Sequence, residues 1–173
     1  MSVVSHLING ELVESQRTLD VTNPSTGKVV RQVADASAAD VERAIAAAQA
    51  AFPAWRDTPP AKRAQVMYRF KQLLEEHADR LVQLVSEEHG KTVEDAMGEL
   101  KRGIENVEYA CGVPELLKGE YSHNVGPGID AWSNFQPLGV VASITPFNFP
   151  AMVPLWMYPM AIACGNTFIR KRS

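Results

Sequence analysis

The sequence predicts an α/β protein in which a layer of helices packs beside a parallel β-sheet. Three observations predict this class: β-prone runs with tight turns fill residues 7–30, helical periodicity follows over residues 37–110, and a strand-helix-strand pattern occupies residues 139–170. The chain of 173 residues is 46% hydrophobic, which is enough for a packed core. Its net charge of -3 argues against a nucleic-acid-binding surface.

The first segment is predicted to form hairpins. Short apolar pairs alternate with turn residues, most clearly at Asn9-Gly10 and at Gly27. Asn-Gly and other glycine-containing turns are typical of tight connections between antiparallel strands. We therefore expect an extended hairpin arm, with no core of its own.

Capping signals predict a series of helices after the arm. Ser37 with Asp40, and Thr92 with Asp95, have the spacing of side chains that satisfy the first backbone amides of a helix. Gly90 is a typical helix stop. The expected helices are 37–51, one that begins at Pro59-Pro60, 78–89, and one from Thr92 toward Ala110.

The helical period ends before Glu120. Residues 120–135 are irregular and contain Gly126-Pro127-Gly128, which is typical of a strand or hairpin that leaves the helical layer. Residues 126–131 also match the loose GxGxxA pattern of dinucleotide sites. No strand-to-helix turn surrounds them, so we do not interpret them as a nucleotide site.

A βαβ unit occupies the last part of the sequence. Residues 139–145 are typical of a strand, an apolar helix is expected up to Gly165, and residues 166–170 are expected to form the second strand. The loop Thr145-Pro-Phe-Asn-Phe-Pro150 lies where open α/β sheets bind ligands. Asn148 in this loop has two interpretations. It caps the following helix, which the spacing alone favours, or its carboxamide donates to an oxygen that becomes negative during a reaction.

The loop resembles the signature of the aldehyde dehydrogenase family, in which a Pro-aromatic-Asn-Phe-Pro segment carries an oxyanion-holding asparagine. Many members of the family have tryptophan at the position of Phe147. The phenylalanine resembles the branch that oxidises methylmalonate semialdehyde to an acyl-CoA. Further segments resemble the family, or that branch, in the expected order along the chain: 7–11, 23–27, 102–112, 116–120 and 165–169.

The resemblance implies an NAD-dependent oxidoreductase with CoA as co-substrate, which converts methylmalonate or malonate semialdehyde to propionyl-CoA or acetyl-CoA in valine and inositol breakdown. It implies that Asn148 is catalytic and that Thr145, Phe147 and Lys171 bind NAD, Lys171 through the adenosine ribose. Without the resemblance, Lys171 is interpreted as a solvated lysine at a strand end. Two residues near Lys171 depart from the family pattern. Arg170 replaces a leucine at a strand position that is expected to be buried, and Arg172 replaces a proline.

Arg102 is the candidate for binding the substrate carboxylate. The resemblance places it on the helix that lines the substrate entrance, and a guanidinium is suited to holding a carboxylate. The alternative is a surface arginine that pairs with Glu105 on the same helix.

The resemblance also implies the amino-terminal part of the aldehyde dehydrogenase fold: a hairpin arm, a helical layer and the start of a parallel Rossmann-like NAD-binding sheet. The catalytic cysteine and general-base glutamate of the family fall beyond residue 173, so residues 1–173 alone are expected to be inactive, and the full-length form is expected to be a homotetramer. Neither Cys111 nor Cys164 is expected to be the nucleophile. The three parts are residues 1–119 (arm and helices), 120–137 (part of the oligomerisation sheet) and 138–173 (first βαβ unit).

No metal site, nucleic-acid partner or membrane partner is expected. The two cysteines form no CxxC pattern, the histidines lack ligand spacing, and the most apolar stretch, 151–164, is too short to span a bilayer. The first residues do not resemble a targeting sequence, which predicts a cytoplasmic protein. Two alternatives stay open: another NAD(P)-dependent aldehyde dehydrogenase, and a non-catalytic module that associates through residues 120–135.

Overall fold

A computed structural model describes residues 3–171, and its first part is an arm of short strands. The strands are β1 (Val3–Val4), β2 (His6–Ile8), β3 (Glu11–Val13), β4 (Thr18–Thr22) and β5 (Val29–Ala34). Strands β2 and β3 pair antiparallel through a turn at Asn9 and Gly10, both with positive φ. Strands β4 and β5 form the second predicted hairpin, so the expectation of a hairpin arm is confirmed. The parallel pairing of β1 with β5 was not predicted, because a two-residue strand leaves no pattern in the sequence.

The predicted helices form, and their caps are the expected ones. They are α1 (Ala38–Arg56), α2 (Pro60–Glu76), α3 (Ala78–His89), α4 (Val93–Cys111) and the short α5 (Val113–Leu116). The Ser37 hydroxyl accepts from the Asp40 amide at 3.2 Å, and the Thr92 hydroxyl accepts from the Asp95 amide at 3.1 Å. Helix α1 continues past the predicted end at residue 51, and the Trp55 indole near its end donates to the Ile162 carbonyl at 2.8 Å.

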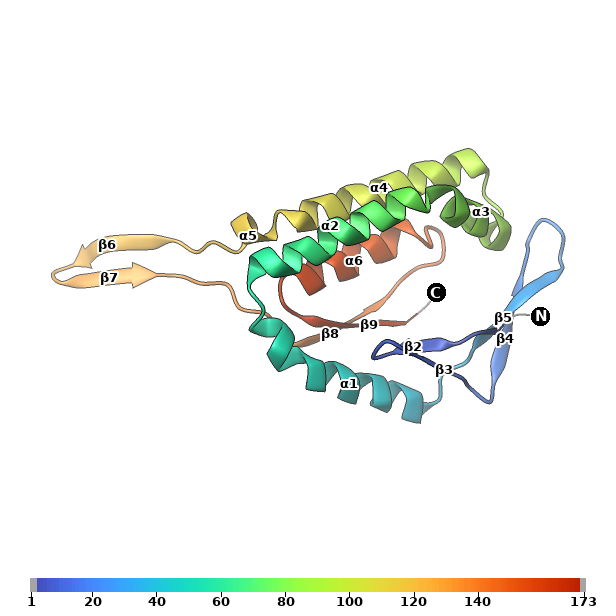
Figure 1. Ribbon diagram of the computed structural model, residues 1–173, viewed down its shortest axis with the longest axis horizontal. Helices are drawn as coiled ribbons and strands as arrows, with labels where there is room; N and C mark the ends of the chain where they lie inside the picture. Colours follow the sequence, from blue (N-terminus) through green and yellow to red (C-terminus); the bar gives the residue numbers. More distant parts are fainter. Residues whose placement is uncertain (1–2, 172–173) are drawn as a thin grey trace.

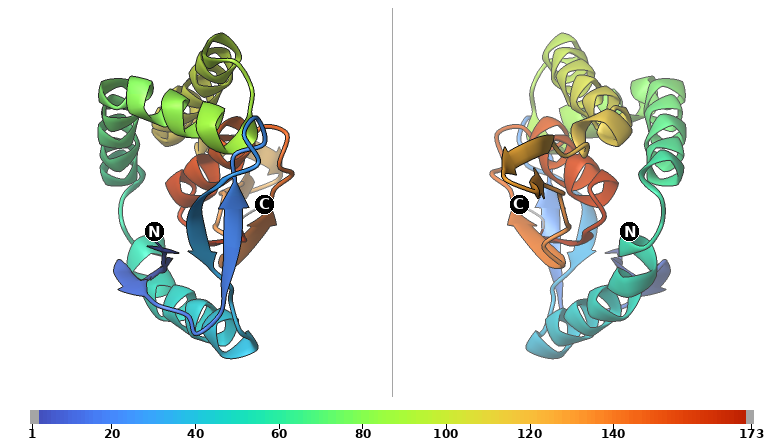
Figure 2. Two further views of the ribbon diagram at one scale, coloured as in Figure 1. Left: turned by 90° about the vertical axis from the view of Figure 1, so that its right-hand side faces the viewer. Right: turned by 90° about the vertical axis from the view of Figure 1, so that its left-hand side faces the viewer.

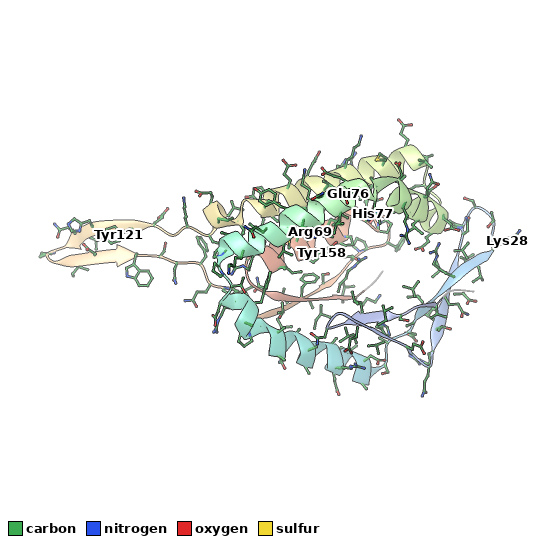
Figure 3. All side chains as sticks on the ribbon, in the orientation of Figure 1. Lys28, Arg69, Glu76, His77, Tyr121 and Tyr158 are labelled. Carbon is green, nitrogen blue, oxygen red and sulfur yellow. The ribbon has the colours of Figure 1, made fainter. Side chains whose placement is uncertain are left out.

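Residues 120–135 form the expected hairpin, with strands β6 (Tyr121–Gly126) and β7 (Ile129–Trp132). Gly126-Pro127-Gly128 makes the hairpin tip, so the GxGxxA match is a turn between antiparallel strands. The hairpin projects from one end of the molecule (Figure 1). Tyr121 marks its position in Figure 3, away from all helices.

The βαβ unit consists of β8 (Val140–Ile144), α6 (Met152–Ala163) and β9 (Thr167–Lys171). The two strands pair in parallel, with Val140 opposite Thr167 and Ile144 opposite Lys171. The expectation of a buried Arg170 is wrong: its side chain is exposed, because the described residues leave this end of β9 uncovered. Arg172 lies outside the described residues.

The β8–β9 sheet lies between two helical layers. Helix α1 is on one side, and α6 with α2 and α4 behind it is on the other (Figure 1). The end-on views in Figure 2 show α6 between the upper helices and α1. Tyr158 of α6 points toward β9 (Figure 3), with its ring centroid 6.1 Å from that of Phe168 and 5.8 Å from that of Phe70. Its burial raises the pKa of the Tyr158 hydroxyl to about 12.

The core is centred on the crossing of α4 and α6. Gly103 of α4 is buried against Leu155 of α6, and a Cβ at Gly103 would lie only 2.5 Å from Leu155 Cδ1 and 3.2 Å from its Cβ. The helix backbones therefore approach more closely than a side chain at Gly103 would allow. The buried apolar residues of the two core clusters are Ala64, Met67, Ala110, Cys111, Val113 and Ala163, and Val82, Ala96, Leu100, Val107 and Leu155.

We expect two glycine-to-alanine changes in α4 to have opposite effects on stability. A Cβ added at Gly98 would meet no atom within 4 Å, so Gly98→Ala should stabilise by roughly 0.5–1 kcal/mol through helix propensity. Gly103→Ala should lower stability, because overpacking against Leu155 costs about 1–3 kcal/mol and exceeds the same propensity gain. Thermal unfolding of both variants beside the unsubstituted protein checks the signs. An equal rise in both melting temperatures would contradict the close helix approach.

Candidate active-site loop

The loop at the carboxyl end of β8 brings three of the predicted site residues to one edge of the sheet. Thr145, Phe147 and Asn148 follow β8 directly. Lys171 stands opposite Ile144 in the register, about one strand spacing of 4.8 Å away. Phe147 is 77% exposed, and Asn148 and Lys171 are also exposed, whereas Thr145 is buried.

Asn148 does not cap α6. The residue at the cap position is Ala151, which makes no side-chain cap bond, and the Asn148 carboxamide has no hydrogen-bond partner among residues 3–171. The interpretation of Asn148 as a helix cap is therefore wrong. Both carboxamide hydrogens are free to bind a ligand.

Glu99 of α4 caps α6 across the helix interface. Its side chain is fully buried, and its Oε1 accepts from the amides of Ala151 at 2.7 Å and Met152 at 3.0 Å. A carboxylate is well suited to the positive end of a helix. The sequence analysis missed Glu99. The available signal was a charged residue beside Leu100, on the face of α4 that Ala96 and other apolar residues occupy.

Lys91, in the connection between α3 and α4, joins Glu99 to the loop. Its Nζ lies 2.5 Å from Glu99 Oε2, donates to the Asn148 carbonyl at 3.2 Å, and lies 4.5 Å from the centroid of the Phe149 ring. The Lys91 side chain is only 10% exposed. Lys91 and Glu99 therefore hold the loop backbone while the Asn148 side chain stays exposed.

Arg102 lies on α4 three residues after Glu99, so the two positions are neighbours on the helix surface. Arg102 is exposed, and its guanidinium makes no hydrogen bond or ion pair with any residue from 3 to 171. The predicted alternative pair with Glu105 is absent from this part of the chain. The guanidinium is therefore available to an external anion.

Apolar and basic side chains meet at the carboxyl edge of the sheet. Ile144 is 76% exposed and Phe147 is 77% exposed, beside the exposed ammonium of Lys171. The Thr145 hydroxyl oxygen is buried without a hydrogen-bond partner in the described chain. An exposed apolar surface with a nearby cation is suited to a ligand that has both rings and hydroxyl groups.

The two thiols are unsuited to nucleophilic attack. Cys111 is buried and Cys164 is half-buried, and burial raises the pKa of both thiols. Within residues 3–171, no three histidine, cysteine, aspartate or glutamate side chains gather as a metal site would require. None of the helices in that range combines the length and the hydropathy needed to cross a membrane.

Two surface hollows lie away from the loop. One, of about 430 Å³, runs along α2, and the other, of about 410 Å³, lies beside the arm and the start of α1. The lining residues are Lys62, Gln65, Val66, Arg69, Phe70 and Leu73 in the first, and Glu14, Ser15, Gln16, Arg17, Asp35, Ser37 and Asp40 in the second. The Asn148 loop contributes to neither.

Comparison with known proteins agrees with the architecture. Residues 12–173 match the sequence profile of the aldehyde dehydrogenase family. The malonate-semialdehyde dehydrogenase of Pseudomonas aeruginosa is 71% identical over the whole chain, which covers 35% of that protein.

The chain is also similar to solved crystal structures over its whole length. The methylmalonate-semialdehyde dehydrogenase of Oceanimonas doudoroffii has a TM-score of 0.97 and 67% identity, and this chain covers 36% of it. A putative methylmalonate-semialdehyde dehydrogenase of Sinorhizobium meliloti, solved as a complex with NAD, has a TM-score of 0.96 and 47% identity, also with 36% covered. The chain spans about a third of the length of these relatives. Both the sequence match and the shared fold show that the chain belongs to the aldehyde dehydrogenase family.

Proposed function

We propose that residues 1–173 supply the oxyanion-donor loop and part of the NAD site of a CoA-acylating dehydrogenase for methylmalonate and malonate semialdehyde. The observation that carries the proposal is the exposed, unbonded carboxamide of Asn148 at the carboxyl end of β8, on a backbone fixed by Lys91 and Glu99. The relatives named above act on aldehydes of this class, which supports the choice of substrate.

In the proposed mechanism, the role of Asn148 is electrostatic. A thiolate from the part of the enzyme beyond these residues attacks the aldehyde carbon, and the carbonyl oxygen becomes negative. The Asn148 carboxamide donates a hydrogen bond to that oxygen, and a donor fixed in advance stabilises the developing charge more than mobile water does. The aldehyde carbon then gives up its hydride to bound NAD, and the substrate carboxylate leaves as CO2. CoA is the proposed acceptor of the remaining acyl group, and its thiol displaces the enzyme thiolate.

The sheet edge fits the NAD that the family implies. Lys171 is suited to donating to ribose hydroxyls, and Phe147 offers an apolar wall beside the loop. Thr145 is buried, and we propose that it contributes to this edge through its backbone. When bound, NAD supplies the hydride acceptor for the oxidation. NAD and CoA are metabolites of the cell interior, and with a bacterial relative at 71% identity we propose the cytoplasm as the location.

A chimera tests the activity. Residues 1–173 replace the corresponding third of the Pseudomonas aeruginosa relative, and NADH formation is measured with methylmalonate and malonate semialdehyde, with and without CoA. We expect CoA-dependent turnover of both. A chimera that oxidises simple aldehydes but shows no CoA-dependent turnover would contradict the substrate and acyl-acceptor assignments, and would favour another class of aldehyde dehydrogenase.

We expect Arg102→Leu in the chimera to lower kcat/KM for the carboxylated aldehydes by about tenfold or more, because a charged hydrogen bond contributes about 1.5–3 kcal/mol. Propionaldehyde, which has no carboxylate, should be affected less than about twofold. Lys101→Leu is the matched control, since it removes a neighbouring exposed cation from the same helix. Equal losses on both substrates would mean that Arg102 has a structural role.

The β6–β7 hairpin is the proposed site of subunit association, and we propose a homotetramer for the full-length enzyme. The hairpin exposes Tyr121, Val125, Ile129 and Trp132, each by 57–71%, and its two strands have no further strand beside them in the described chain. Isolated two-stranded sheets are marginally stable, and unpaired edges favour association. The same surface supports the second candidate, an association module without catalysis. Sedimentation of the chimera as a monomer would contradict the association role.

A further inference from the structure

A buried ion pair, Lys91 with Glu99, lies beside the loop. The Glu99 side chain is fully buried and that of Lys91 is 10% exposed, with 2.5 Å between Nζ and Oε2. Two buried charges lose their hydration, and a pair of apolar residues of similar volume is often equally stable or more stable. A contribution to stability is therefore a weak explanation for the pair. The groups that the two side chains contact are the better guide to its role.

The other interactions of this pair converge on the loop. Glu99 Oε1 accepts from the amides of Ala151 and Met152, and Lys91 Nζ donates to the Asn148 carbonyl. The ammonium also lies above the ring of Phe149, at a distance where a cation attracts an aromatic face. The backbone is thus held at Asn148 itself and at the two amides that begin α6.

We propose that Lys91 and Glu99 are positioning residues that fix the Asn148 donor before the aldehyde binds. The inference rests on the proposed function of Asn148 as the oxyanion donor. The Asn148 carbonyl is bound to Lys91, so rotation of the peptide group that follows its Cα is restricted while the carboxamide remains free. A donor that needs no reorganisation contributes most to a transition state, and a misplacement of about 1 Å can cost about 100-fold in rate.

Lys91→Met in the chimera is the direct test. The single-turnover rate of NADH formation should fall about tenfold or more, and the KM for NAD should change less than about twofold. Backbone amide exchange of residues 146–152 should become faster, which reports the loop without reference to activity. Lys71→Met is the matched control, because it removes a lysine that pairs with Glu75 of α2 and Glu108 of α4, neither of which belongs to the loop.

Lys91→Met leaves the buried Glu99 carboxylate without its cation, which could itself disturb the fold. A second variant avoids this unpaired charge. Lys91→Met with Glu99→Gln carries no charge, and the glutamine carbonyl can still accept from the α6 amides. A folded variant with the same loss of rate supports the inference. A folded variant with a rate within about twofold of the parent chimera would overturn it.

A double-mutant comparison with Asn148→Ala distinguishes positioning of Asn148 by Lys91 from a general loss of activity. If Lys91 acts through Asn148, Lys91→Met should lower the rate no further in an Asn148→Ala background. An independent, multiplicative loss would overturn the inference while leaving the role of Asn148 intact. An Asn148→Ala chimera with unchanged rate would instead overturn the proposed function, and this inference with it.

Discussion

Asn148→Ala in the chimera is expected to lower kcat by about 100- to 1,000-fold when chemistry limits turnover, the usual effect of removing one oxyanion donor. The affinity for NAD should stay nearly the same, because the carboxamide acts on the aldehyde oxygen. Asn148→Asp should be at least as damaging, since a carboxylate accepts hydrogen bonds and repels the oxyanion. Single-turnover formation of NADH measures the chemical step.

The control is Asn134→Ala, which removes another exposed asparagine carboxamide away from the loop. It should leave kcat unchanged. A near-normal single-turnover rate in Asn148→Ala would show that the carboxamide does not contact the reacting oxygen. Since this side chain does not cap α6, a loss of rate cannot be attributed to helix capping.

Glu99→Leu is expected to destabilise the protein by about 3–5 kcal/mol, the largest stability effect that we predict. The substitution leaves the Lys91 ammonium without its carboxylate in a site that is 10% exposed, and it removes the acceptor from the amides of Ala151 and Met152. Urea denaturation of the chimera measures the change. Glu105→Leu, at an exposed position of the same helix, should change stability by about 0.5 kcal/mol or less.

The double variant Lys91→Leu with Glu99→Leu separates the two causes of that loss. Removal of both charges eliminates the unpaired ammonium, so the double variant should be more stable than Glu99→Leu alone. The remaining cost should be about 1–3 kcal/mol, from the amides that have lost their acceptor. If Glu99→Leu costs less than about 1 kcal/mol, the pair is not the buried unit that its geometry indicates.

Local interactions made most of the fold predictable. The Ser37 and Thr92 caps, the Gly90 helix end and the Gly126 to Gly128 turn each involve residues within a few positions of one another. A sequence pattern can record such contacts because both partners stand in the same short window. The parallel pairing of β8 with β9 followed in the same way, from the strand-helix-strand pattern around Asn148.

Long-range contacts account for what the sequence did not predict. The spacing around Asn148 favoured a helix cap, but the true acceptor is Glu99, 52 positions before Ala151. Glu99 was recognisable only as a charge on an apolar helix face, which identifies a buried polar residue without its partner. The exposure of Arg170 depends on which distant elements cover the end of β9, which its own neighbours in sequence do not specify.

The residues that hold the Asn148 loop are synthesised before the loop itself. Lys91 and Glu99 both precede Asn148, and the amides that Glu99 binds end at Met152. In an enzyme as long as the relatives, all groups of this network therefore lie in the first third of the chain to be synthesised. Domains generally fold in the order of their synthesis. In the proposed full-length enzyme, the loop around Asn148 can thus take its final shape on the nascent chain, before synthesis is complete.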